Sequence, residues 1–285
     1  MPTVRDLRDR IRSLKNTQQI TKAMKQVAAA KIRRAEALQK QSRPYADAID
    51  GMLRDLIANV HAVDHPYMRP GRDGAPGGVI LMTADKGLAG SFNANLIRLA
   101  ELHGRGHADA VWYAVGVKAR NALRRQPGET KAFWPLGQGE MFANARELAR
   151  RVSDDFTAGT ISSVTLISPK LINMMTQRPE QRQLLPIVAA EQTERSARAG
   201  AVEFEPTPEF VLGRLLPKYL EFTLYSAMLE TNASFYAAQL VAMSNATDNA
   251  KKLIDQNTVE MNKARQAAIT KEILEIVGGA EALAG

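Results

Sequence analysis

Both ends of the chain are long stretches that contain neither proline nor glycine, the two residues that most often interrupt helices. One stretch runs from Thr3 to Arg43 and the other from Lys218 to Val277, so they are 41 and 60 residues long. As helices with a rise of about 1.5 Å per residue they measure roughly 60 and 90 Å. Globular helices usually have about 8–20 residues, so these lengths indicate a coiled coil, a membrane span or a repeat.

A membrane span is excluded, because charged and amide residues recur through both stretches and neither holds ~18 consecutive apolar residues. We therefore expect no direct membrane insertion. The charged first residues also lack the apolar segment of a secretory signal. The absence of cysteine excludes a disulfide, a thiolate metal site and a cysteine nucleophile. These features are typical of a cytoplasmic protein.

The net charge of +8 is concentrated at one end of the chain. Residues 1–43 contain 12 Lys and Arg but 3 Asp and Glu, a net charge of +9 that leaves −1 for the rest. Such an arm can bind nucleic acid, an anionic membrane or an acidic protein surface, or can be a solvated helix face. Nucleic acid is the weakest of the functional alternatives, because no aromatic residue precedes Tyr45 on which a base could stack.

The C-terminal stretch has apolar residues at alternating steps of three and four, the period of a left-handed coiled coil. They are Leu212, Leu215, Tyr219, Phe222, Ser226, Leu229, Ala233, Tyr236, Leu240 and Met243. The same register continues through Thr247, Ala250, Ile254, Asn257, Met261, Ala264 and Ala268. Small and polar residues replace large ones there, which predicts a thin seam: a weak coiled coil, or a rod whose surface slides past a partner.

The N-terminal stretch begins with the same spacing, at Val4, Leu7, Ile11 and Leu14. Polar residues 16–19 then interrupt the pattern. It resumes out of phase at Ile20, Met24 and Val27, which predicts a local change in the supercoil.

Pro44 either ends or kinks this helix, because proline lacks the amide donor of an interior turn. Apolar residues at helical spacing follow it and favour a continuation; they are Ile49, Met52, Leu53, Leu56 and Ile57. Prolines and glycines between His65 and Gly78 then indicate a linker.

Between the two long stretches, short apolar runs alternate with helical patterns. The predicted strands are 79–83, 111–115, 131–134, 164–168 and 184–188, and the predicted helices are 93–103, 117–125 and 140–156. This alternation is typical of parallel βαβ units. We predict a central α/β domain (79–190), N- and C-terminal coiled-coil helices (1–60 and 209–285) and two linkers (61–78 and 191–208). The simplest packing is an antiparallel helix pair in which the C-terminal helix extends further by about 20 residues, or ~30 Å.

No catalytic constellation is evident. The loop from Thr83 to Ser91 follows the first predicted strand but matches neither G-x-G-x-x-G nor G-x-x-x-x-G-K-[ST], so a packed turn is favoured over a nucleotide site. His103 and His107 are four residues apart, but glycines between them are expected to break the helix that would align them. Neither this pair nor His61 and His65 has a nearby carboxylate triad. We therefore predict no catalytic residue, no cofactor and no metal.

Four segments carry a resemblance to a known family: Ile20–Met24 with Val27–Lys31; Ser42–Ala46 with His65–Tyr67; Thr83–Gly90; and Met243 with Ala246–Ala250, leading to Ala264–Ala280. They resemble the gamma subunit, or central-stalk rotor, of bacterial F-type ATP synthases. The last segment is the most specific, and its signature residues are Ile269, Thr270, Glu272, Glu275, Gly279 and Ala280. The resemblance spans nearly the whole chain and is weakest from about residue 105 to 200.

The resemblance implies a non-catalytic rotor, present once in each complex, whose antiparallel helices stand inside a hexamer of alpha and beta subunits. A small Rossmann-like domain that binds no nucleotide is implied to rest on the epsilon subunit and the membrane c-ring. Proton or sodium flow through the membrane is implied to drive rotation and ATP synthesis, with the reverse during hydrolysis. The protein is implied to be peripheral, on the cytoplasmic side of the bacterial inner membrane, with no nucleic acid bound.

Individual residues acquire expected roles in the same way. The resemblance implies that Met24, Lys25, Gln266 and Thr270 lie near loops of the beta subunits and that Glu205 faces the c-ring. A coiled-coil core position is the alternative for Met24. The basic N-terminal helix is expected to face acidic beta-subunit loops. The alanine-rich and polar residues 257–271 are expected to let the rod turn in an apolar collar.

The chain departs from the family pattern at several positions. Phe235 and Gln239 stand where the family usually has glutamate and arginine, and Ala84 and Ala89 replace a serine and a cysteine. The arginine is implied to bond a beta-subunit loop, so one charge-assisted contact of ~1.5–3 kcal/mol should be weaker here. Three alternatives stay open: the rotor of a divergent second F-type ATPase, including a sodium-translocating one; a basic nucleic-acid-binding or scaffold protein; and a Rossmann-type enzyme with helical arms.

Overall fold

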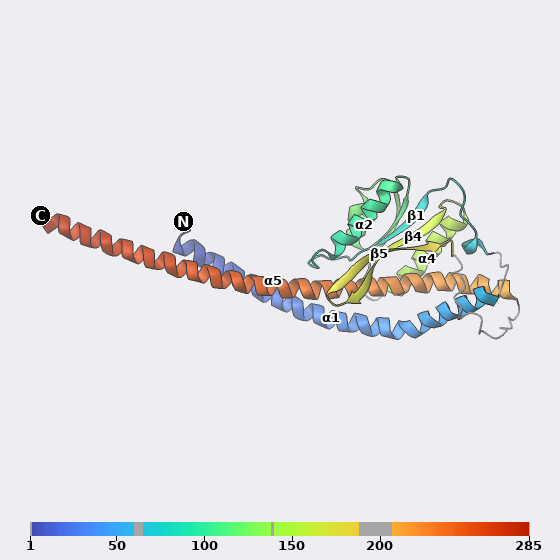
Figure 1. Cartoon of the computed structure of the whole chain (residues 1–285), viewed down its shortest axis with the longest axis horizontal. Coiled ribbons are helices and arrows are strands. Elements are labelled where there is room, and N and C mark those ends of the chain that lie inside the picture. The colour runs from blue at the N-terminus through green and yellow to red at the C-terminus, as the bar shows by residue number, and fades with distance from the viewer. Residues whose placement is uncertain (1, 60–64, 138–139, 188–206, 285) are drawn as a thin grey trace. The chain divides into compact units, whose positions relative to one another are not determined.

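The computed structural model describes residues 2–59, 65–137, 140–187 and 207–284 (Figure 1). The chain divides into two compact units: residues 29–239, which contain the α/β domain, and residues 1–28 with 240–285. The described helices are α1 (Val4–Asn59), η1 (Pro66–Met68), α2 (Phe92–Gly106), α3 (Val117–Leu123), α4 (Met141–Thr157) and α5 (Pro208–Ala284). The described strands are β1 (Gly77–Met82), β2 (Val111–Val115), β3 (Glu129–Trp134), β4 (Ser163–Asn173) and β5 (Thr176–Leu185).

The sheet has five strands in the order β3-β2-β1-β4-β5. The first four are parallel, and Ile80 of the central strand lies opposite Tyr113 on one side and Leu166 on the other. Residues Gly78 to Met82 of strand β1 are all buried, as expected for a parallel strand that is covered on both faces. The predicted α/β class with long flanking helices is therefore confirmed.

Strand β5 differs from its prediction in both position and direction. It spans Thr176–Leu185 rather than 184–188, and it pairs antiparallel with β4 as a hairpin. The Asn173 side chain accepts hydrogen bonds from the backbone amides of Met175 and Thr176 and so fixes the turn. Because β5 is an edge strand, polar residues occupy most of it. The apolar run that predicted this strand therefore includes only its last two residues, Leu184 and Leu185.

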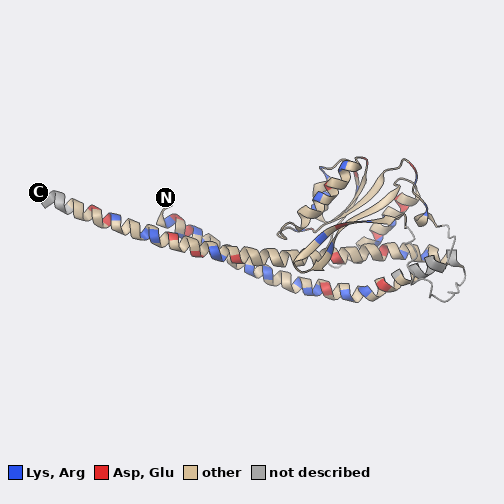
Figure 2. Ribbon diagram, viewed as in Figure 1, with Lys and Arg blue, Asp and Glu red and all other residues tan. Residues whose placement is uncertain are grey.

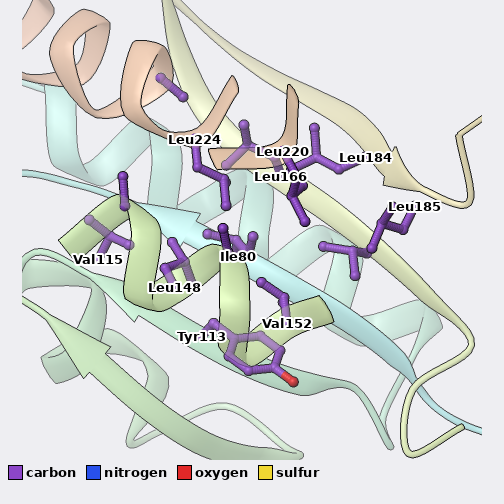
Figure 3. Close-up of a cluster of buried hydrophobic side chains, with 14 of the residues drawn as sticks. Ile80, Tyr113, Val115, Leu148, Val152, Leu166, Leu184, Leu185, Leu220 and Leu224 are labelled. Atoms are coloured by element: carbon purple, nitrogen blue, oxygen red, sulfur yellow. The ribbon is translucent and has the colours of Figure 1, made fainter. Parts of the chain in front are cut away.

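Two apolar clusters fill the opposite faces of the sheet, because successive side chains of a strand point to opposite sides. Val79 and Leu81 belong to the cluster that includes residues of α2 and α3, whereas Ile80 and Met82 belong to the cluster that includes α4. Figure 3 shows Leu220 and Leu224 of α5 in this second cluster, with Leu148 and Val152 of α4.

Helix α5 has a second apolar face that the heptad pattern did not predict. Leu216, Leu220 and Leu224 follow the seam residue Leu212 at steps of four residues; all four are at most 1% exposed and pack in the cluster of the α/β domain. The predicted seam residues Leu215, Tyr219 and Phe222 are only partly buried, and the ring centroid of Phe222 lies 4.1 Å from that of Tyr45 on α1. This part of α5 is therefore buried on two sides, which explains why it is apolar around most of its circumference.

Both long helices pass through a proline. Helix α1 continues past Pro44 to Asn59, as the apolar spacing favoured, and α5 begins at Pro208 and continues through Pro217. A proline removes one helical hydrogen bond, and at Pro217 the burial of the neighbouring Leu216 and Leu220 offsets that loss.

The leucine face of α5 should dominate the stability of the α/β domain. Leu220→Ala removes a side chain that is 1% exposed and leaves a cavity, so we expect the free energy of unfolding to fall by about 2–5 kcal/mol. Leu102→Ala is the matched control, since Leu102 is 56% exposed on α2, and its expected cost is below ~1 kcal/mol. Urea unfolding measures both values, and equal losses in the two variants would contradict this packing.

Candidate functional site

The first part of α1 and the second half of α5 form an antiparallel pair. The Lys25 amine donates to the Ser244 hydroxyl at 2.9 Å, and the hydroxyls of Thr21 and Thr247 lie 2.9 Å apart. Position numbers rise along one helix as they fall along the other, which defines the antiparallel direction. The predicted antiparallel arrangement of the terminal helices is confirmed.

The seam between these helices is thin. On α5 the less exposed residues follow the predicted register from Met243 through Ala264, and Ala250 and Asn257 are among the most buried, at 4% and 5% exposed. On α1 the most buried positions include Leu7 and Ala28. Small and polar side chains therefore hold much of this pair, so its packing is weaker than that of a leucine-rich coiled coil.

The predicted phase change in α1 is wrong. Ile20 and Val27 are 60% and 53% exposed, whereas Thr21 and Ala28 are 8% and 0% exposed. The heptad that begins at Val4 continues in phase through the polar segment. The register is kept because Thr247 of α5 faces Thr21 and is also polar. The two hydroxyls form a hydrogen bond between the helices, whereas Ile20 and Val27 point to solvent.

The last part of α5 has no partner within the described chain. Every residue from 265 to 279 is exposed, and the last half-buried position is Ala264. The exposed apolar residues of this end are Ile269, Ile273, Leu274, Ile276 and Val277, at 48–72% exposure. Helix α5 reaches Ala284, so about 20 residues, or ~30 Å, extend beyond the paired region. An apolar surface of this extent on a solvent-exposed helix is typical of a protein-binding site.

Two glycines near the C-terminal end of α5 have no packing reason among the described residues. Gly278 and Gly279 are helical, and a Cβ added at either would meet no atom within 4 Å. Glycine in a helix costs ~1 kcal/mol relative to alanine. Because no neighbour in the described chain requires a small residue there, a closely approaching partner is the simplest reason for both.

Lysines and arginines recur along α1 (Figure 2). The lysines and arginines are exposed at most of these positions, while Lys25 bonds Ser244 and Lys31 lies over the ring of Tyr236 at 5.2 Å. The N-terminal part of α1 therefore has a positively charged, solvent-exposed surface.

The loop after β1 is held by its own side chains. Asp85 accepts hydrogen bonds from the backbone amides of Val117 and Leu136, at 3.0 and 3.2 Å. Asn93 accepts from the amide of Ala84 and donates to the carbonyl of Lys86. The loop is thus a rigid, packed turn at the carboxyl ends of the parallel strands.

One residue of this turn is strained. Leu88 has a φ of +61°, which L side chains other than Asn and Asp seldom adopt, and it is 62% exposed. Such conformations persist where the surroundings hold them, and they cluster at functional sites.

The residues named by resemblance lie in different environments. Met24 is half-buried and Lys25 bonds across the seam, whereas Gln266 and Thr270 are exposed and one helical turn apart, linked by the Thr270 hydroxyl to the Gln266 carbonyl. Gln239 is 9% exposed. Glu205 lies outside the described residues. The structure thus brings Gln266 and Thr270 together on the unpartnered end of α5.

The signature residues at the end of the chain are also helical. Ile269, Glu272, Glu275 and Gly279 are exposed, Glu275 lies 3.5 Å from Lys271, and Ala280 lies within α5. Sequence reasoning did not find Leu88, Ile273 or Ile276 as surface residues, although the step from Ile269 to Ile273 and Ile276 is the spacing of one helix face.

The expectation that glycines break the helix between His103 and His107 is wrong. Helix α2 continues to Gly106, and the two imidazole rings stack with centroids 4.5 Å apart. A Cβ at Gly104 would lie 3.3 Å from the ring of Trp112, so close packing on the sheet explains this glycine. Burial lowers the pKa of His103. Within the described ranges, no group of three or more His, Asp or Glu could hold a metal ion.

No helix among the described residues is long and apolar enough to cross a membrane. The fold defines a class of proteins in which two long helices flank a central α/β domain, and in the described part of the chain the last segment of α5 is apolar and has no partner.

Comparisons with known proteins agree with this class. The family described as ATP synthase matches residues 3–283. The chain is 45% identical to the ATP synthase gamma chain of Heliobacterium modesticaldum, covering 99% of this chain and 100% of that one. It is 43% identical to the gamma chain of Desulforamulus reducens with the same coverage. The chain belongs to the gamma-chain family of ATP synthases.

Solved structures give the same fold. A chain in the central stalk and c-ring structure of Tetrahymena thermophila mitochondrial ATP synthase has a TM-score of 0.61 at 25% identity, covering 80% of this chain and 99% of that one. A chain in the Euglena gracilis mitochondrial ATP synthase has a TM-score of 0.69 at 21% identity, covering 98% of this chain and 94% of that one.

The polar seam can be tested by making it apolar. We expect Thr21→Val together with Thr247→Val to strengthen the helix pair by about 1 kcal/mol, because two partly buried hydroxyls are replaced by methyl groups of the same shape. Amide hydrogen exchange of residues 2–28 and 240–264 measures the effect, with Thr17→Val on the exposed face as the control. Faster exchange in the double variant would show that the hydroxyl pair stabilises the seam.

Proposed function

We propose that this chain is the central-stalk rotor of a bacterial F-type ATP synthase. Its paired helices turn inside a ring of alternating alpha and beta subunits, and its α/β domain rests on the epsilon subunit and the c-ring. Transmembrane proton or sodium flow then drives ATP synthesis, and ATP hydrolysis drives the reverse rotation. The observation that carries the proposal is the unpartnered apolar end of α5 in a chain of the gamma-chain family.

In this proposal the chain itself catalyses nothing. ATP is made and hydrolysed on the beta subunits, and the rotor changes which conformation each of them adopts. A single rotor presents different faces to the chemically identical sites around it. Because a contact shifts an equilibrium only if it stabilises one state more than another, this asymmetry is what the rotor contributes.

The surfaces of the paired helices fit these contacts. The apolar end of α5 suits an apolar collar, which binds without directional bonds that would have to be broken at each step. The basic residues of α1 suit acidic loops of the beta subunits, where exposed charge pairs are weak enough to be remade. Met24, Lys25, Gln266 and Thr270 are proposed to lie at these contacts, together with Leu88 of the rigid turn.

The α/β domain is proposed to transmit torque from the membrane side. Glu205, in the segment before α5, is proposed to face the c-ring. The chain then acts as a peripheral protein on the cytoplasmic side of the bacterial inner membrane, as one copy in each complex, without a cofactor of its own.

The apolar end of α5 can be tested by adding charge. Ile276 is 72% exposed, so Ile276→Asp should change the stability of the isolated chain by less than ~0.5 kcal/mol. In the assembled complex, the buried carboxylate should lower ATP synthesis relative to ATP hydrolysis at least ~10-fold, equivalent to ~1.4 kcal/mol. Leu102→Asp on α2 is the matched control. Normal coupling in the Ile276 variant would rule out a collar contact at this residue.

Gln239, which stands where the family usually has arginine, allows a second test of the beta-subunit contact. We expect Gln239→Arg to change the ATPase rate or the coupling of the assembled complex, because a charge-assisted contact worth ~1.5–3 kcal/mol replaces a neutral one. Gln239→Met has a similar length without charge and should leave both quantities near those of the wild type. Identical kinetics for the arginine and methionine variants would remove Gln239 from the beta-subunit contact.

A further inference from the structure

A small pocket lies where the carboxyl ends of the parallel strands meet the long helices. Its volume is about 190 Å³. The residues that define its chemistry are Lys31 of α1, Asp85 and Lys86 of the turn after β1, and Asn232, Phe235 and Tyr236 of α5. All six belong to the unit of residues 29–239. Ligands of α/β proteins commonly bind outside the carboxyl ends of parallel strands.

We propose that this pocket binds a small oxyanion of the size of inorganic phosphate. The central donor is the side-chain amide of Asn232. This residue is 4% exposed, and its Nδ2 is buried and finds no hydrogen-bond partner among the described residues. Asn232 also lines the pocket. Buried amide donors are almost always satisfied, so we take the unpartnered Nδ2 of this lining residue to indicate an acceptor that enters from outside the chain.

The charge of the pocket also favours an anion. Lys31 and Lys86 contribute two positive charges, and Asp85 contributes one negative charge. One oxygen of Asp85 already accepts the backbone amides of Val117 and Leu136, which disperses its charge. The net positive charge, beside the apolar walls of Phe235 and Tyr236, attracts an anion.

The site is organised in advance of binding. Asp85 and Asn93 fix the turn that carries Lys86, and Lys31 is held over the ring of Tyr236 at 5.2 Å. Asn232 projects from a part of α5 whose neighbours Ala233 and Ser234 are fully buried. A preorganised site loses little conformational entropy when a small ion binds.

The size of the pocket limits the ligand. Pockets for drug-sized ligands occupy ~300–1,000 Å³. A volume of about 190 Å³ is below that range. This volume accommodates a single tetrahedral oxyanion, and the loop after β1 lacks the glycine motif of a nucleotide site.

The test is calorimetric titration of the full chain with inorganic phosphate in chloride buffer. We expect saturable binding with a Kd on the order of 1 mM, competition by sulfate and weaker binding of acetate, which is planar and has two oxygens rather than four. Asn232→Leu preserves the size of the side chain and should weaken phosphate binding at least ~10-fold, equivalent to ~1.4 kcal/mol. Asn249→Leu, at an exposed position of the same helix, should bind phosphate as the wild type does.

Lys31→Met provides a second variant, because its charged end can be removed without disturbing the core; it should also weaken binding. The NMR resonance of the Asn232 side-chain amide, assigned by its loss in the Asn232→Leu variant, should shift when phosphate is added. No saturable binding, unchanged binding in both pocket variants, or a preference for acetate over phosphate would overturn the proposal. The titration uses the chain alone, so its result is independent of the rotor function.

Discussion

Burial of the leucine row of α5 is the interaction on which the rest of the structure depends. Leu216, Leu220 and Leu224 are at most 1% exposed and pack in the cluster that also holds the α4 side of the sheet. Full burial of such a side chain contributes roughly 1.5–3 kcal/mol, so the row fixes the α/β domain to the long helix. For a rotor this anchor has a direct consequence, because torque applied to the domain is delivered to a helix that cannot turn separately from it.

The chemistry of α5 changes along its length, and each part suits a different neighbour. The first part is apolar on two sides and is buried by the α/β domain and α1. In the other unit, small and polar residues such as Ala250 and Asn257 face α1, and the final segment exposes isoleucines and two glycines. Strong packing is therefore concentrated where the helix must be fixed, and weak or absent packing occurs where a partner is proposed to move past it.

The sequence predicted most of the architecture because its strongest signals are local. Breaker-free length located α1 and α5, and apolar runs located the buried parallel strands. The errors arose where a neighbour decides the structure. Edge strand β5 is polar over most of its length and so has an apolar run only at its end. Thr21 is buried because Thr247 faces it, and α2 continues through Gly104 because Trp112 packs against that glycine. A helical glycine costs only ~1 kcal/mol, which tertiary packing outweighs. The resemblance named Gln266 and Thr270 but not the adjacent apolar face, because its exposure depends on the lack of a packing partner among the described residues.

Direct observation of rotation tests the central claim. The chain contains no cysteine, so Asp109→Cys, at an exposed turn before β2, provides a single attachment point for an optical probe. The labelled chain would be assembled with its alpha and beta subunits, which are fixed to a surface. We predict rotation in one direction that requires ATP and stops when the beta subunits are inhibited. ATP hydrolysis by the same assembly while the probe stays still would contradict the account.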